Sequence, residues 1–310
     1  MIDINLLRDT VRTHAGGIMK PTVYTFFSEA SMAYHTVLVH LDLDTHCATR
    51  VAHAATMVAP GGVLVGVAMS GVSRMLYRSS TTPESDEYLA LHLAFLRERA
   101  HDALAAFDRQ AARPGMPACE GRLIDDEVAS GLSLEARVAD VLVLTQPEQS
   151  SDVLAHILPH AGRPVLVLPA VLTVADKPMR RVLVAWDASR EAGRALASAL
   201  PLLRGADVID IVVCETEADS RVARDVQMAD PLPWLARHGV TATLRHHALD
   251  SGGLFKRDAV GEALLAIADD GAYDLMVMGA YTHSRLRETF LGGVTRTVLA
   301  HMTLPVLLEH

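Results

Sequence analysis

The sequence repeats itself, and this repeat constrains the fold more than any other feature of the 310-residue chain. Residues 35–42, HTVLVHLD, align with residues 180–187, RRVLVAWD, so that Asp42 falls on Asp187. The ends of the two copies align as well. A repeat of about 130 to 140 residues has the size of a normal domain. We therefore expect two domains of the same architecture in tandem.

Short Val-rich runs alternate with Ala- and Leu-rich stretches in each copy, which predicts five strands with helices between them. In the second copy the expected strands are 182–186, 208–213, 241–247, 275–278 and 305–308, and the expected helices are 191–203, 233–238, 257–269 and 294–301. Continuous apolar strands are typical of parallel sheets covered by helices on both faces. Right-handed crossovers then make each copy a doubly wound, Rossmann-like α/β domain.

The domain boundaries follow from the ends of the repeat. We place the first domain at residues 33–170, a polar linker with Pro178 at 171–179, and the second domain at 180–310. Residues 1–32 differ from both copies. We interpret them as an N-terminal extension that is either an unstructured leader or the product of an upstream start codon.

Composition excludes several classes of protein. The formal net charge is −9 and there is no basic block, which argues against nucleic-acid binding. The longest apolar stretch, 58–72, is interrupted by Pro60 and several glycines and is too short to cross a membrane. The N-terminus lacks the order of a signal peptide. Three widely spaced cysteines suit a reducing compartment, so we expect a cytoplasmic protein.

A candidate anion site follows the fourth strand of the second copy. The strand ends at Gly279, a polar loop with arginines follows, and Gly292 and Gly293 open the last helix. Spacing alone favours glycines that merely end a strand and open a turn. The order of strand, basic loop, Gly-Gly and helix favours a phosphate cradle, because a helix N-terminus offers unpaired N–H donors.

The first copy lacks this feature. Its corresponding segment, TQPEQSSD at 145–152, is shorter, has neither glycine nor arginine, and carries Glu148. We therefore expect a phosphate site in the second copy alone. The first copy is then a degenerate domain retained for structure, pairing or regulation.

The repeated unit, with an aspartate after its first strand and a Gly-loop-Gly segment before its last helix, resembles the universal stress protein family in tandem form. The resemblance covers roughly residues 33–310 and implies a fold similar to the adenine nucleotide α-hydrolases. ATP-binding members carry Gly, two residues, Gly, nine residues, Gly, and then Ser or Thr. Here Gly279, Thr282, Gly292 and Gly293 occupy these positions, so the second glycine and the hydroxyl residue are both replaced.

The resemblance implies that the second domain binds an adenine nucleotide, ATP or AMP, with Mg²⁺. Asp187 would contact the adenine through its carboxylate, although a turn or a helix cap is an equally good explanation for an aspartate there. Val213 would contact the base through its backbone. The full set of candidate binding residues is Asp187, Val213, Gly279, Thr282, His283, Ser284, Arg285, Gly292, Gly293, Val294 and Thr295.

The two replaced positions have physical consequences. Thr282 is strained if its backbone needs a positive φ. Gly293 removes a side-chain hydroxyl from the phosphate, a loss of about 1–2 kcal/mol. Ser284, Thr295, His283 or Arg285 are the residues that can compensate.

Three functions stay open at this stage: a nucleotide-binding module that regulates a stress response through an unknown protein partner, a slow ATP hydrolase, and a structural or partner-binding protein without nucleotide. The sequence has no nucleophile elbow, Walker motif or zinc spacing. His283 is the one candidate base in the loop. We therefore predict no catalytic and no metal-ligating residues, with at most weak ATP hydrolysis.

Assembly is predicted from the last strand of each copy. Residues 164–167 and 305–308 are short and apolar, and we expect both at a sheet edge. Because exposed apolar edges tend to be paired, the two domains should pack through these strands about a pseudo-twofold axis. A fragment of residues 180–310 should then form a homodimer that imitates the tandem.

Overall fold

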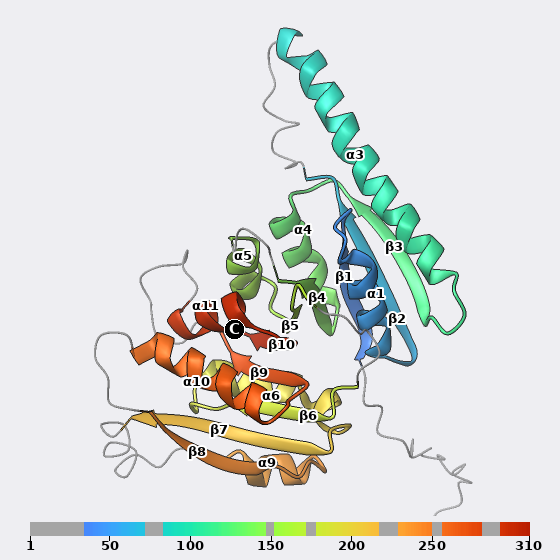
Figure 1. Ribbon diagram of the computed structural model, residues 1–310. Helices are drawn as coiled ribbons and strands as arrows, with labels where there is room; N and C mark the ends of the chain where they lie inside the picture. Colours follow the sequence, from blue (N-terminus) through green and yellow to red (C-terminus); the bar gives the residue numbers. More distant parts are fainter. Residues whose placement is uncertain are drawn as a thin grey trace, which may run out of the picture. The chain divides into compact units, whose positions relative to one another are not determined.

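The structure is a computed structural model that describes residues 34–71, 83–146, 152–171, 178–216, 229–249, 256–280 and 292–310 (Figure 1). The predicted extension at 1–32 and most of the predicted linker lie outside the described residues. The interpretation of both segments therefore stays a prediction.

The first half alternates strands and helices. Its elements are β1 (Tyr34–Leu41), α1 (Cys47–Thr56), β2 (Val58–Met69), α3 (Pro83–Ala111), β3 (Ala118–Ile124), α4 (Val128–Glu135), the short 3₁₀ helix Ala136–Val138, β4 (Val141–Thr145), α5 (Asp152–His160) and β5 (Val165–Leu168). The residues of β4 and β5 are almost all buried, as expected for strands with helices on both faces.

The second half repeats the pattern. Its elements are β6 (Arg181–Ala185), α6 (Arg190–Ser198), α7 (Leu200–Leu203), β7 (Val208–Thr216), α9 (Leu232–Arg237), β8 (Thr243–Leu249), α10 (Lys256–Asp270), β9 (Leu275–Gly279), α11 (Gly293–His301) and β10 (Val306–Glu309). The strands and helices predicted for this copy are confirmed. One helix differs, because 191–203 divides at Ala199 into α6 and α7. Pro201 has no N–H to continue the helix.

The ten strands within the described residues belong to one sheet, in the order β3-β2-β1-β4-β5-β10-β9-β6-β7-β8. Within each half the strands pair in parallel. The doubly wound α/β class is thereby confirmed. In the second half the order changes direction between β6 and β9, where the chain leaves β6 towards one side and reaches β9 on the other. Ligands of doubly wound sheets bind at the carboxyl ends of the strands beside this point.

Successive residues of the central strands enter two different hydrophobic cores, because side chains of a strand alternate between its faces. Val277 of β9 packs in the core that contains Ala195 and Leu196 of α6. Met278 packs in the core that contains Leu264 of α10 together with residues of α11. Figure 1 shows α10 and α11 next to each other. Helix α6 and the pair α10–α11 therefore cover opposite faces of the second half.

The two halves meet where β5 pairs with β10. This pair is antiparallel, and its register matches Leu307 with Leu166, Val306 with Val167 and Leu308 with Val165. Leu166 and Leu307 are equivalent positions of the repeat, so the register is that of a local twofold axis. The strands are fully buried. The apolar ends of the two copies thus cover each other within one chain. The dimerisation of an isolated 180–310 fragment stays a prediction.

Candidate functional site

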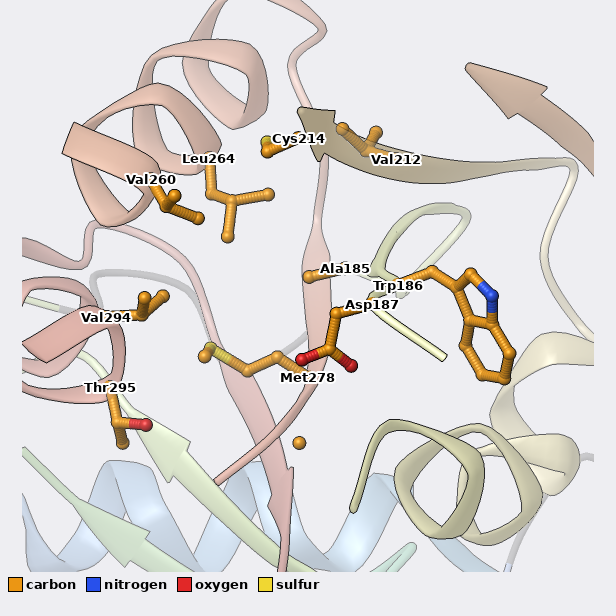
Figure 2. A pocket seen from close by; sticks show the side chains of 11 residues that line it. Ala185, Trp186, Asp187, Val212, Cys214, Val260, Leu264, Met278, Val294 and Thr295 are labelled. Atoms are coloured by element: carbon orange, nitrogen blue, oxygen red, sulfur yellow. The ribbon is translucent and has the colours of Figure 1, made fainter. Parts of the chain in front are cut away.

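A pocket lies at the carboxyl ends of β6, β7 and β9, beside the point where the strand order changes direction (Figure 2). It encloses about 530 Å³ of space that protein atoms do not fill, open solvent included. Its walls come from the ends of the three strands, from α10 and from the first turn of α11.

Asp187 lines this pocket directly after β6. Its Oδ1 atom accepts a hydrogen bond from the Ser189 N–H at 2.9 Å. Ala188 between them has a φ of 57°, which makes the turn tight. Ser189 then caps α6, because its hydroxyl accepts from the Ala192 N–H at 3.1 Å. The role of a turn residue therefore accounts for one of the two carboxylate oxygens of Asp187. The side chain as a whole still faces the pocket.

Gly279 ends β9 and lines the pocket, and a close contact explains its lack of a side chain. A Cβ atom at this position would lie 2.6 Å from the backbone N of Ala192 and 2.7 Å from the carbonyl carbon of Glu191. The first turn of α6 packs directly on the strand end. The described geometry thus gives this glycine a steric role towards α6, in addition to its predicted role beside a phosphate.

The start of α11 forms the opposite wall. Val294 and Thr295 line the pocket, and the Thr295 residue is 3% exposed. The helix N-cap is Gly292, which provides no side-chain hydrogen bond. Its φ of −57° needs no glycine, and a Cβ there would meet nothing. Neither Gly292 nor Gly293 has a side chain that could accept a hydrogen bond from the first-turn N–H groups of α11.

The remaining predicted residues divide into two groups. Val213 is buried and does not line the pocket, while its neighbours Val212 and Cys214 do. The backbone contact of Val213 with the base, which the resemblance implies, stays a prediction. The other group, Thr282, His283, Ser284 and Arg285, lies outside the described residues.

Sequence reasoning missed most of the apolar wall. It is made by Ala185, Trp186, Val212, Cys214, Val260, Leu264 and Met278 (Figure 2). Strand alternation could have found part of it, because Ala185, Cys214 and Met278 occupy equivalent faces at the strand ends. Burial raises the pKa of the Cys214 thiol to about 11. The thiol is therefore neutral at physiological pH and contributes an apolar surface.

Among the residues that the structure describes, no group of three or more His, Cys, Asp or Glu side chains is arranged to hold a metal ion. Nor does any helix within the described ranges have the length and hydropathy needed to cross a membrane.

The equivalent corner of the first half, at the carboxyl ends of β1 and β4, is occupied by an arginine. Arg50 is 3% exposed and donates from Nε to the His40 carbonyl at 3.0 Å and from a terminal nitrogen to Thr145 Oγ1 at 2.8 Å. Its other terminal nitrogen lies 2.8 Å from Asp42 Oδ1. Burial opposes ionisation of Asp42, but a hydrogen bond from His40 and the charge of Arg50 outweigh it and hold the pKa of Asp42 well below its usual range. Asp42 is thus already paired with Arg50.

Comparison with known proteins decides the family. The family model described as "Universal stress protein family" matches residues 178–309. The C-terminal half of this chain is a universal stress protein domain. A curated relative, the universal stress protein Slr1230 of Synechocystis sp., is 44% identical over 46 residues, which are 15% of this chain and 16% of that protein. The chain therefore matches only a small part of this relative's length.

Solved universal stress proteins extend the likeness to both halves. One from Archaeoglobus fulgidus DSM 4304 has a TM-score of 0.62 at 16% identity, covering 89% of this chain and 98% of that chain. A putative universal stress protein from Pseudomonas aeruginosa UCBPP-PA14 has a TM-score of 0.53 at 13% identity, covering 91% of this chain and 95% of that one. At such identities the likeness shows the fold alone, and it includes the first half as well as the second.

Proposed function

We propose that the second half binds an adenine nucleotide, ATP or AMP, and that the protein acts as a cytoplasmic, nucleotide-responsive binding module of a stress response. The observation that carries this proposal is the pocket beside β6 and β9, which has the Asp187 carboxylate on one wall and the first turn of α11 on another. A universal stress protein domain with such a pocket is suited to a ligand that has an apolar ring at one end and an anion at the other.

The lining matches the parts of the nucleotide. Val212, Cys214 and Leu264 offer an apolar surface for the flat base. The Asp187 carboxylate is a hydrogen-bond acceptor for an exocyclic amino group, which adenine has. The first-turn N–H groups of α11 suit a phosphate, because they are unpaired within the helix and lie at its positive end. Any Mg²⁺ would enter with the phosphates, as is usual for this ion.

Binding is favoured over hydrolysis. The described lining contains one ionisable carboxylate, Asp187, and it lies on the wall suited to the base. A general base must reach the water that attacks a phosphate. The alternative of a partner-binding protein without nucleotide draws on the two replaced motif positions, Thr282 and Gly293, because Gly293 supplies no hydroxyl to a phosphate.

The test is nucleotide titration of the purified chain by calorimetry, using ATP and AMP with and without Mg²⁺. Asp187→Asn keeps the acceptor for the Ser189 N–H but presents an amide to the base, so affinity should fall about tenfold or more. Asp42→Asn is the matched control at the equivalent position and should leave affinity unchanged. A wild-type chain that binds neither nucleotide, or equal losses in both variants, would contradict the proposal.

A further inference from the structure

The two helices that begin at the candidate site both end against side chains of the first half. Helix α6 begins shortly after Asp187, and α11 begins at Gly293. At the far end of α6, the Tyr34 hydroxyl donates to the Ser198 carbonyl at 2.8 Å. At the far end of α11, the Gln146 amide donates to the Leu299 carbonyl at 2.7 Å and to the Ala300 carbonyl at 3.3 Å.

These contacts meet a general need of helices. The last four carbonyl groups of a helix have no partner within it, so a side-chain donor at the C-terminus stabilises the end of the helix. Ser198 is the last residue of α6, and Leu299 and Ala300 lie in the last turn of α11. The first half thus supplies donors to two helix ends of the second half.

Gln146 is itself held in place. Its amide oxygen accepts from the Ala170 N–H at 3.2 Å, and its backbone N–H donates to the Leu168 carbonyl at 2.7 Å. Both Gln146 partners lie at the end of β5, the strand that pairs with β10. The amide group therefore connects the junction of the halves to the C-terminus of α11.

Tyr34 is fixed in a similar way. It is 5% exposed, and its burial, with the Asp140 and Glu309 carboxylates nearby, raises the pKa of its hydroxyl well above the usual value. The hydroxyl therefore stays protonated and remains a donor to Ser198.

The second half cannot return these contacts through equivalent residues. In the alignment of the repeat, Tyr34 falls on Met179 and Gln146 falls on Ala280. Neither Met nor Ala has a side-chain hydrogen-bond donor. Through these positions, side chains of the first half stabilise helix ends of the second half. The corner of the first half is filled by Arg50, while the pocket of the second half is open.

We propose that the first half positions the nucleotide site of the second half through the C-termini of α6 and α11, with Gln146 as the main positioning residue. This inference rests on the proposed nucleotide binding. Because a helix moves as a rigid element, holding the C-terminus of α11 at Gln146 fixes the direction of the N–H groups of Gly293 and Val294 at its other end. Tyr34 has the same effect on α6, whose first turn packs on Gly279.

The experiment measures ATP affinity by calorimetry and amide hydrogen exchange of α11 in the full-length chain. Gln146→Ala should weaken affinity about three- to tenfold, the usual effect of one lost hydrogen bond, and speed exchange in α11. Gln146→Lys, which restores a donor at the helix C-terminus, should recover most of the affinity.

Gln110→Ala is the matched control. Gln110 also donates its amide to a helix carbonyl, that of Ala48 at 2.9 Å, but within the first half. It should leave ATP affinity and α11 exchange unchanged. If Gln146→Ala does not fold, Tyr34→Phe tests the same idea, because it removes one hydroxyl and should weaken affinity about two- to threefold.

The outcomes separate the two proposals. Unchanged ATP affinity in a folded Gln146→Ala chain overturns the positioning role, and so does an equal loss in Gln110→Ala or a failure of Gln146→Lys to recover affinity. Where Tyr34→Phe carries the test, unchanged affinity in that variant has the same meaning. A wild-type chain that binds no adenine nucleotide overturns the proposed function as well.

Discussion

The two halves use the same corner of the same fold in opposite ways. In the first half Arg50 crosses from α1 to Thr145 at the end of β4 and to Asp42 after β1. In the second half the position equivalent to Arg50 is Ala195, which is buried in the core. The equivalent of Thr145 is Gly279, and the equivalent of Asp42 is Asp187, which faces a pocket.

The difference shows that an aspartate retained in a repeat need not face an open pocket. One large side chain on the neighbouring helix is enough to engage it. The start of the helix changes too, since α1 begins at Cys47, the equivalent of Ala192, whereas α6 begins at Arg190. The bare Gly279 accepts this earlier start, because α6 packs where a side chain would otherwise lie.

Gly279→Thr copies the first-half residue into the second half and should have the largest effect. The new Cβ meets the backbone of Glu191 and Ala192, which cannot rotate away. We expect a loss of about 3 kcal/mol in the free energy of unfolding, measured by urea denaturation. The control is Gly193→Ala in α6, the helix that Gly279 contacts. A Cβ at position 193 meets nothing, so stability should rise by about 0.5–1 kcal/mol. Similar small effects in the two variants would contradict the steric explanation.

Arg50→Ala removes the side chain that distinguishes the first half. It should lower the free energy of unfolding by about 2–3 kcal/mol, because the His40 carbonyl and the Thr145 hydroxyl lose their donor and Asp42 loses its cation. ATP affinity should stay unchanged, since the proposed site is in the other half. Arg180→Ala, which removes an exposed ion pair to Asp207, is the control and should change stability by less than about 0.5 kcal/mol. Equal stability of both variants would show that Arg50 is not structural.

The pH dependence of stability should show a smaller effect of the same pair. The pKa of Asp42 is lowered in the folded chain, so its contribution is fully present above its unfolded pKa of about 3.9 and is lost as the pH falls below that value. The stability difference between wild type and Arg50→Ala should therefore be constant from about pH 5 to pH 8 and shrink towards pH 3. Urea midpoints at pH 7 and pH 3 measure it. A difference that is equally large at pH 3 would exclude Asp42 as the partner that matters.

The sequence predicted the elements and their order well, because the repeat and the apolar runs are local signals. The division of a predicted helix near Ala199 had a local signal too, in Pro201, which sequence reasoning overlooked. Asp187 was a candidate through the family resemblance, and it lies in the lining of the pocket.

Features that depend on distant contacts could not be predicted in the same way. Val260 and Leu264 reach the pocket because α10 docks on the sheet, and no local pattern states where a helix docks. Arg50 reaches Thr145 across 95 positions of sequence, and Gln146 reaches Leu299 across 153. The steric reason for Gly279 likewise depends on the approach of α6.

The pairing of β5 with β10 also determines how occupancy would respond to ligand concentration. Two separate copies joined along such a symmetric pair would carry two identical sites, and identical sites can bind cooperatively. Here both partners of the pair belong to one polypeptide, so the two halves are free to differ, and one corner is open while the other is filled by Arg50. With the one proposed site in the described part of the chain, saturation by nucleotide would be hyperbolic, with a Hill coefficient of about one. The proposed response to nucleotide would then be graded over a wide range of ligand concentration.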